Sequence, residues 1–144
     1  MNNESCIGEA PVYESLTLTQ VAGRLTARVP TLILFHARPD GDAVGSAFAL
    51  RTLLCAMGMP AWCVCADEVP ARLRFLMHGS QDSVLPDAIP ADVDWSRVVS
   101  VDTASPAQLG ALWERFCGKI DMMIDHHGAG TPYADGLIVP DLPF

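Results

Sequence analysis

The sequence has no apolar stretch long enough to cross a membrane and no recognisable secretory leader. A membrane-spanning helix needs about 20 consecutive apolar residues, whereas the most apolar segment, residues 43–57, is interrupted by Gly45, Ser46, Arg51 and Thr52. The first ten residues contain no basic segment followed by an apolar run, which a signal peptide would have. We therefore expect no membrane partner and a cytoplasmic location.

Basic residues are also scarce. Nine Lys and Arg stand against 17 Asp and Glu, which gives a formal charge of −8, and the basic residues are scattered along the chain. A protein that grips long nucleic acid needs a basic patch that neutralises phosphates, so we expect no such partner. The excess of acid has two interpretations that stay open at this point: a solvated acidic surface, or aspartates gathered in one place to bind cations.

The chain lacks a cysteine framework. Its five cysteines are an odd number and occur in unrelated contexts. Cys63 and Cys65 lie in an apolar segment typical of a strand, and we expect their side chains on opposite faces, where they would not share a metal ion. Ordinary packing is expected for both, because free cysteine behaves as a small buried hydrophobe.

What the sequence does contain is an alternation of helices and short apolar strands. With 144 residues, half of them hydrophobic, the chain has room for one globular domain with a real core. The expected helices are residues 14–28, 43–57 and 105–118 with a short one at 73–77, and the expected strands are 31–35, 61–66, 97–101 and 120–124, followed by a short apolar run at 137–139.

These strands read as continuous apolar runs, which is typical of a parallel sheet buried on both faces. We therefore expect an α/β fold, a parallel sheet with helices on both faces. In such folds, ligands bind beyond the carboxyl ends of the strands. Candidate functional residues should therefore follow the strands directly.

Three of the expected strands end in aspartate or histidine, at His36, Asp40 and Asp42, at Asp102, and at Asp125, His126 and His127. Carboxylates with one or two imidazoles suit divalent ions such as Mn²⁺, Mg²⁺ or Co²⁺. Crowded carboxylates repel one another unless cations offset them. The pattern predicts a site for two divalent metal ions.

Each of these motifs also has a plain structural explanation. The Asp40-Gly41-Asp42 segment could be a turn in which Asp42 caps the second helix. Asp102 could be satisfied by nearby N–H groups, and His126-His127 could be an ordinary loop pair. Taken singly, each explanation is at least as good as a metal site. Their joint occurrence at three strand ends favours the metal site.

The motifs resemble those of DHH-family phosphoesterases. The segment H-A-R-P-D-G-D-A-V-G-S (36–46) resembles the first family motif, V-D-T-A (101–104) the second, and D-H-H (125–127) the third. The similarity extends from about residue 14 to the end of the chain. Within the family, the chain most resembles bacterial enzymes that degrade very short oligoribonucleotides (nanoRNases) and dephosphorylate 3′-phosphoadenosine 5′-phosphate (pAp). Type II pyrophosphatases, RecJ-type exonucleases and cyclic-dinucleotide phosphodiesterases are more distant.

The resemblance implies a role for each matching residue. His36 and Asp40 are implied as ligands of one metal ion, Asp42 and His126 as ligands of the other, and Asp102 as the carboxylate that bridges them.

The remaining matching residues are implied in positioning and in substrate binding. His127 is implied as a catalytic contact of the scissile phosphate or leaving group, and Asp125 as the partner that orients the histidines. Gly45 and Ser46 are expected to open the second helix, where backbone N–H groups would help hold an anionic substrate.

The chain departs from the family pattern at its end. The family's fourth motif and its C-terminal substrate-binding domain would follow the DHH motif, and residues 1–144 contain neither. We therefore expect a partial N-terminal metal-binding domain with an exposed sheet edge. Such a fragment should be weakly active or inactive alone, and a homodimer is an option for a full-length form.

The expected function is hydrolysis of short oligoribonucleotides or pAp by a water activated between two metal ions. Two alternatives stay open. One is a pyrophosphatase or cyclic-dinucleotide phosphodiesterase of the same family, since the metal motifs do not separate these substrates. The other is a non-catalytic remnant that binds metal or a partner through its unfinished edge.

Overall fold

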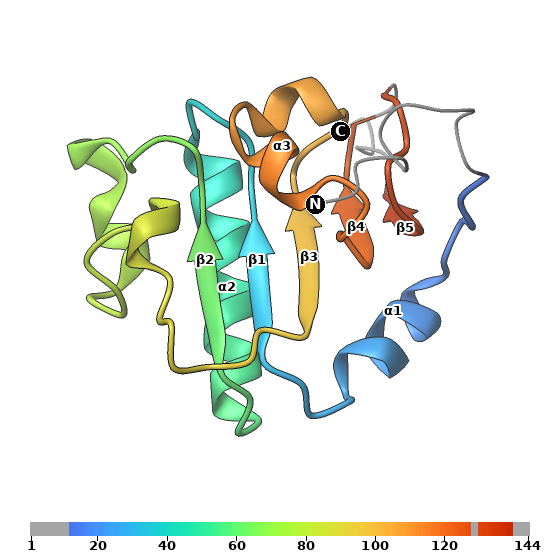
Figure 1. Ribbon diagram of the computed structural model, residues 1–144, viewed down its shortest axis with the longest axis horizontal. Coiled ribbons are helices and arrows are strands. Elements are labelled where there is room, and N and C mark those ends of the chain that lie inside the picture. The colour runs from blue at the N-terminus through green and yellow to red at the C-terminus, as the bar shows by residue number, and fades with distance from the viewer. Residues whose placement is uncertain (1–11, 128–129, 140–144) are drawn as a thin grey trace, which may run out of the picture.

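The computed structural model describes residues 12–127 and 130–139. Its centre is a sheet of five parallel strands in the order β2-β1-β3-β4-β5 (Figure 1). The strands are β1 (Thr31–Leu34), β2 (Ala61–Val64), β3 (Arg97–Val101), β4 (Met122–Asp125) and β5 (Gly136–Ile138). All four pairings between neighbours are parallel. The α/β fold expected from the apolar strands is confirmed.

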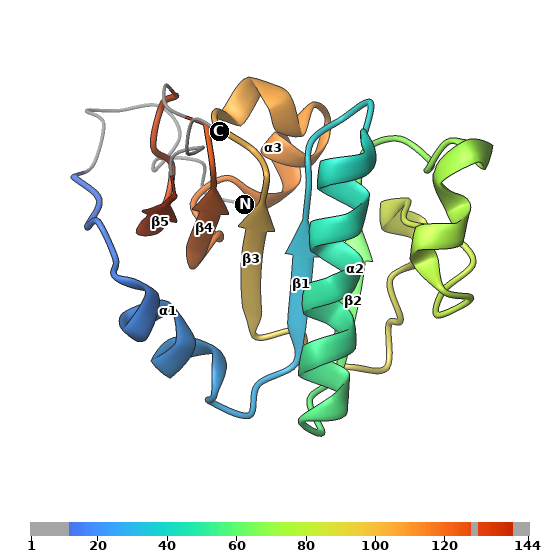
Figure 2. The same cartoon turned by 180° about the vertical axis from the view of Figure 1, so that it is seen from behind.

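Helices cover both faces of this sheet. The helices α1 (Leu18–Leu25) and α2 (Gly41–Ala56) lie on one face, and α3 (Leu112–Phe116) lies on the other (Figures 1 and 2). Ile33 of β1 belongs to the core under α2, and its neighbour Leu32 to the core under α3. Successive side chains of a strand point to opposite faces, so an uninterrupted apolar run is what a sheet with two covers requires.

The first helix is shorter than expected. It begins after Thr17, whose hydroxyl accepts from the backbone N–H of Gln20 while the Gln20 side chain accepts from the Thr17 N–H, a complete capping box. The residues before it are extended instead. Leu16 donates to the Gly136 carbonyl at 2.7 Å, and Gly136 donates to the Glu14 carbonyl at 3.0 Å. This segment therefore covers part of the β5 edge that we expected to be exposed.

The expected helix over 105–118 is wrong as a single element. The structure has a 3-10 helix, η4 (Pro106–Leu109), and then α3, separated at Gly110, whose φ of +61° leaves the helical region. The Ser105 side chain makes no cap hydrogen bond. The Gln108 side chain does not bond the N–H of Ser105 in a capping box, because its Oε1 accepts from the backbone N–H of Ala104 at 2.7 Å instead.

Two further short elements connect β2 to β3, the 3-10 helices η2 (Ala71–Met77) and η3 (Pro86–Ala88). The former includes the short helix expected at 73–77. None of the helices in the described ranges is long and apolar enough to cross a membrane.

Cys63 and Cys65 are free, but they lie on the same face of the sheet, in the core under α2. The expectation of opposite faces is wrong, because residues two apart in a strand share a face. The Cys63 thiol donates to the Ala47 carbonyl and the Cys65 thiol to the His36 carbonyl, at 3.4 and 3.2 Å. Both are packing cysteines, as expected.

Candidate metal centre

The strand order places the expected functional residues at the centre of the sheet. The chain passes from β1 outward to β2 on one side, and it returns to build β3, β4 and β5 on the other side. His36 follows β1, and Asp102 follows its neighbour β3. The carboxyl ends of two adjacent strands whose connections diverge form the crevice in which open α/β sheets bind ligands.

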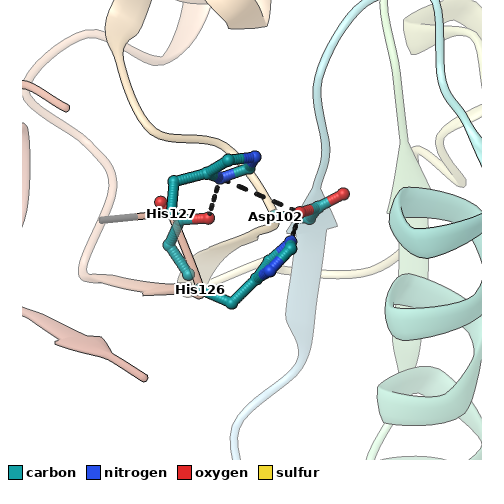
Figure 3. Close-up of side chains that lie close together, drawn as sticks. Asp102, His126 and His127 are labelled. Atoms are coloured by element: carbon teal, nitrogen blue, oxygen red, sulfur yellow. Dashed lines mark hydrogen bonds and ion pairs between the residues drawn. The ribbon is translucent and has the colours of Figure 1, made fainter. Parts of the chain in front are cut away.

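Asp102 is the carboxylate around which the site is arranged. Its side chain is only 4% exposed, and its two oxygens face different strands. The Oδ2 atom lies 3.5 Å from Nε2 of His36, which follows β1, and the Oδ1 atom lies 2.6 Å from Nε2 of His126, which follows β4. Figure 3 shows the imidazoles of His126 and His127 turned toward this carboxylate. Three strand ends therefore converge on one aspartate.

The donor atoms form two overlapping groups that share Asp102. In the first, Nε2 of His36 lies 3.5 Å from Oδ1 of Asp40 and at the same distance from the Asp102 carboxylate. The second group combines Asp102 with Asp125, His126 and His127. Within each group all donor atoms lie within 4.8 Å of one another. A carboxylate shared by two sets of oxygen and nitrogen donors is the arrangement that a pair of divalent ions needs.

The ring of His36 is held in the tautomer that a metal ligand requires. Its Nδ1 lies 2.7 Å from the carbonyl oxygen of Ala37. A carbonyl only accepts hydrogen bonds, so Nδ1 carries a proton, and Nε2 is the nitrogen that faces Asp40 and Asp102. The hydrogen bond on one ring nitrogen thereby fixes the orientation of the other.

His127 is oriented in a similar way. Its Nδ1 lies 2.6 Å from Oδ1 of Asp125, a buried carboxylate that can only accept when ionised. The proton is therefore on Nδ1, and Nε2 remains for a ligand. Asp125 thus orients His127, while the neighbouring His126 pairs with Asp102. The two imidazoles lie against each other with ring centroids 4.5 Å apart.

Asp102 adopts an unusual backbone conformation for a residue with a side chain. Its φ is +52°, in the left-handed region that few non-glycine residues occupy. The surrounding contacts hold it there. The Asp102 N–H donates to the Ile124 carbonyl at 3.0 Å, and the Tyr133 hydroxyl donates to the Thr103 carbonyl at 2.8 Å. Strain of this kind concentrates at functional sites, where the rest of the structure fixes it.

The electrostatics of the site favour a bound cation. Burial raises the pKa of the Asp102 carboxyl, an effect that the hydrogen bond and charge of His126 oppose and the negative charge of Asp40 supports. The backbone N–H of Ala43 lowers the pKa of Asp40. A cation between these groups would stabilise the charged carboxylates that burial and mutual repulsion destabilise. The residues present therefore fit divalent metal ions.

Cavities open on two sides of this cluster. A cavity of about 570 Å³ is lined by His36, Ala37, Arg38, Asp40, Ala107, Gln108, Gly110 and His127. A second cavity of about 640 Å³ has a mostly aliphatic wall, and its polar lining consists of Asp42, Ser46, Asp102, Asp125 and His126. A small ligand would have access to the cluster from either cavity.

The start of α2 differs from both sequence-based interpretations. Asp40, and not Asp42, is the N-cap, since its Oδ1 accepts from the Ala43 N–H at 3.0 Å. Asp42 is exposed and belongs to neither donor group, although it lines the larger cavity with Asp102 and His126. Its role as a ligand stays a prediction.

We expected Gly45 and Ser46 to open α2, and this expectation is wrong. The helix begins at Gly41, so both residues lie past its first turn, where backbone N–H groups donate to carbonyls four residues earlier. Their N–H groups are therefore not available to an anion. Of these two residues, Ser46 lines the larger cavity and Gly45 does not.

Three residues near the site were not singled out from the sequence: Arg38, Gln108 and Tyr133. Arg38 could have been found, because it is the one basic residue inside the first motif. Gln108 lies inside the helix expected over 105–118, and its backbone carbonyl accepts from the Ala37 N–H at 2.7 Å while its side chain accepts from the Ala104 N–H. It therefore joins the loop after β1 to the loop after β3. No local signal marks Tyr133.

Comparisons with known proteins agree with the motifs. A family model described as "DHH family, N-terminal domain" matches residues 30–143. The bifunctional oligoribonuclease and PAP phosphatase NrnA of Thermus thermophilus is 35% identical over 105 residues, which are 72% of this chain and 30% of that protein.

A solved structure shares the fold. The crystal structure of an exopolyphosphatase-related protein from Bacteroides fragilis superposes with a TM-score of 0.68 at 21% sequence identity, covering 82% of this chain and 37% of that one. The chain thus spans about a third of the length of each of these proteins.

Proposed function

Because the chain belongs to the DHH family, we propose that it is the metal-binding part of a phosphoesterase that uses two divalent metal ions, Mn²⁺ in the first instance. The observation that carries this proposal is the position of Asp102. One of its oxygens faces His36 and the other faces His126, from strands on either side of β3. Residues 1–144 are proposed as one metal-binding domain.

We propose His36 and Asp40 as ligands of one ion and His126 and Asp42 as ligands of the other, with Asp102 between them. The mixture of carboxylate and imidazole donors suits Mn²⁺. When bound, the ions supply Lewis-acid stabilisation of phosphate oxygens and lower the pKa of water at the site.

The protein's own contribution is to hold the donors and the substrate in place. Since Nδ1 of His127 is engaged by Asp125, its Nε2 is the atom proposed to contact the phosphate or the leaving oxygen. Fixing an imidazole by a buried carboxylate removes rotational freedom before the substrate binds, and this lowers the entropic cost of alignment.

The proposed substrates are short oligoribonucleotides and pAp. The name of the Thermus relative supports them, and that protein is 35% identical over 72% of this chain. The charge supports small substrates, because a formal charge of −8 with scattered basic residues offers no grip on a long nucleic acid. Hydrolysis of pAp, a diribonucleotide and pyrophosphate, compared under Mn²⁺ on a full-length form with a substrate-binding domain, tests this choice. Pyrophosphate as the best substrate would favour a pyrophosphatase instead.

A metal titration tests the centre directly. We expect calorimetry to show two Mn²⁺ sites for the wild-type chain and their loss in Asp102→Asn, which keeps the size of the side chain and removes its charge. Asp92→Asn is the matched control, because Asp92 is exposed and outside both cavities. Unchanged Mn²⁺ affinity and stoichiometry in Asp102→Asn would rule the proposal out.

A further inference from the structure

Among the described residues, Arg38 is the one Lys or Arg that lines either cavity at the proposed metal centre. It borders the smaller cavity together with His36, Asp40 and His127. The larger cavity has three aspartates and a histidine but no Lys or Arg. A phosphate ester in this acidic region therefore meets a single guanidinium.

The backbone that carries Arg38 is fixed on both sides. The N–H of Ala37 donates to the Gln108 carbonyl at 2.7 Å, and the N–H of Arg38 itself donates to Oδ2 of Asp67 at 2.8 Å. Pro39 is buried, and Asp40 caps α2. The loop is thus held at every residue from 37 to 40.

The backbone conformation at Arg38 is a costly one. Its φ is +51°, in the left-handed region where a side chain is disfavoured by about 1 kcal/mol or more. Glycine would adopt this conformation without strain. The Asp67 carboxylate binds the backbone N–H of Arg38 and makes no ion pair with its guanidinium. A strained residue with a long charged side chain therefore stands where the fold alone would favour glycine.

The guanidinium of Arg38 is without a partner among the described residues. Its side chain is exposed, and no hydrogen bond, ion pair or ring contact in that part of the chain involves it. Arg24 pairs with Asp135 and Arg74 with Glu68. Arg28 and Arg72 also have no partner among the described residues, but neither lines a cavity at the donor cluster. A fixed backbone thus presents an unpaired cation beside the donor cluster.

We propose that Arg38 binds a phosphate group of the substrate in the smaller cavity, next to His36 and His127. This inference rests on the function proposed above and adds a residue that selects substrates by their phosphate. A guanidinium offers two parallel N–H donors that match two phosphate oxygens, which a point charge such as ammonium does not. The rigid loop lowers the entropy that this contact costs, because only the side chain has to be ordered.

Inorganic phosphate is the probe that tests Arg38 without turnover. The full chain, loaded with Mn²⁺, is titrated with phosphate by calorimetry in wild-type, Arg38→Ala and Arg38→Lys forms. We expect phosphate affinity to fall about 10- to 100-fold in Arg38→Ala, as for the loss of hydrogen bonds to a charged group, and partly in Arg38→Lys. Mn²⁺ affinity should not change. Arg72→Ala, an exposed arginine on η2, should bind phosphate like the wild type.

A glycine variant separates binding from folding. Arg38→Gly removes the side chain and also relieves the left-handed backbone, so its thermal midpoint should equal or exceed that of the wild type while phosphate affinity falls as in Arg38→Ala. Wild-type phosphate affinity in Arg38→Ala, or no phosphate binding by the wild-type chain, would overturn the inference.

The outcome for Arg38 is distinguishable from the outcome for the metal centre. If Mn²⁺ does not bind, the proposed function fails, and the same phosphate titrations are made without metal. Weaker phosphate binding in Arg38→Ala then still supports an anion site at Arg38, and equal binding overturns it.

Discussion

Single residues of this site have more than one task. Asp40 caps α2 through the Ala43 N–H and also faces His36. Tyr133 donates to the Thr103 carbonyl and shares a hydrogen bond of 2.6 Å with the Ser100 hydroxyl, so it ties the end of β3 to the loop after β4. Burial raises the pKa of Tyr133, so its hydroxyl stays protonated and remains a donor.

Removal of this hydroxyl should destabilise the fold. Tyr133→Phe leaves the Thr103 carbonyl and the Ser100 hydroxyl without their buried partner, which should cost about 1–3 kcal/mol of unfolding free energy. The edge-to-face contact with Trp113 is retained. Urea denaturation measures the change, and Tyr13→Phe, at a half-buried tyrosine whose hydroxyl has no described hydrogen bond, serves as the control. Equal losses in both variants would contradict this account.

The cysteines should differ in reactivity. Burial raises the pKa of Cys65 to about 11, and it raises the pKa of Cys63 as well. Only the thiolate reacts, so at pH 8 the folded chain should leave both unmodified by a disulfide reagent, whereas the exposed Cys55 reacts. Peptide mass spectrometry identifies the labelled residue. Because the folded-state pKa is raised, the reactivity of Cys65 should appear only as the pH approaches 11.

The elements of this fold show which features a sequence determines locally. The strands were predictable because a parallel strand with two covered faces is a continuous apolar run, and the meeting of His36, Asp102 and His126 followed from the common direction of such strands. The break at Gly110 in the helix expected over 105–118 was not predictable from its pattern, since Leu109 before it and Leu112 and Phe116 after it keep a helical spacing across the break. The choice of Asp40 over Asp42 as the cap was also open, because both residues are equally good caps.

Gly110 provides a test of that break. At φ +61° any Cβ is strained, and one at this position would lie 3.2 Å from Cβ of Ala37, in the loop that follows β1. Gly110→Ala should therefore lower the unfolding free energy by about 1–3 kcal/mol. Gly23→Ala is the opposite case, because nothing lies within 4 Å of its Cβ in the middle of α1. That change should stabilise the chain by about 0.5–1 kcal/mol. Equal effects from the two substitutions would show that the break at Gly110 carries no strain.

The molecule as a whole brings its candidate metal-ligating carboxylates and imidazoles together at one end of the sheet, in a chain whose formal net charge is −8. A bound metal ion should reduce the repulsion among the carboxylates around Asp102. Since a ligand that binds only the folded state stabilises that state, metal binding should raise the free energy of unfolding. The same linkage would hold for any cation that fits both donor groups.

Thermal unfolding should therefore depend on Mn²⁺. At a free concentration 100 times the dissociation constant, one site adds about 2.7 kcal/mol to the unfolding free energy, and a chelator should reverse the shift. Asp102→Asn should unfold at the same temperature with and without Mn²⁺. A metal-dependent shift that survives this substitution would place the ion elsewhere on the molecule.

The strand order also has a consequence for how the site comes into being. Thr31 pairs with Arg97, 66 residues later in the chain, and this pairing brings the ends of β1 and β3 together. Contacts so distant in sequence carry a large loop-closure entropy and slow the folding reaction. During refolding, the helices should therefore form before the proposed site can bind a metal ion. The time at which a metal ion binds would then report the pairing of β1 with β3.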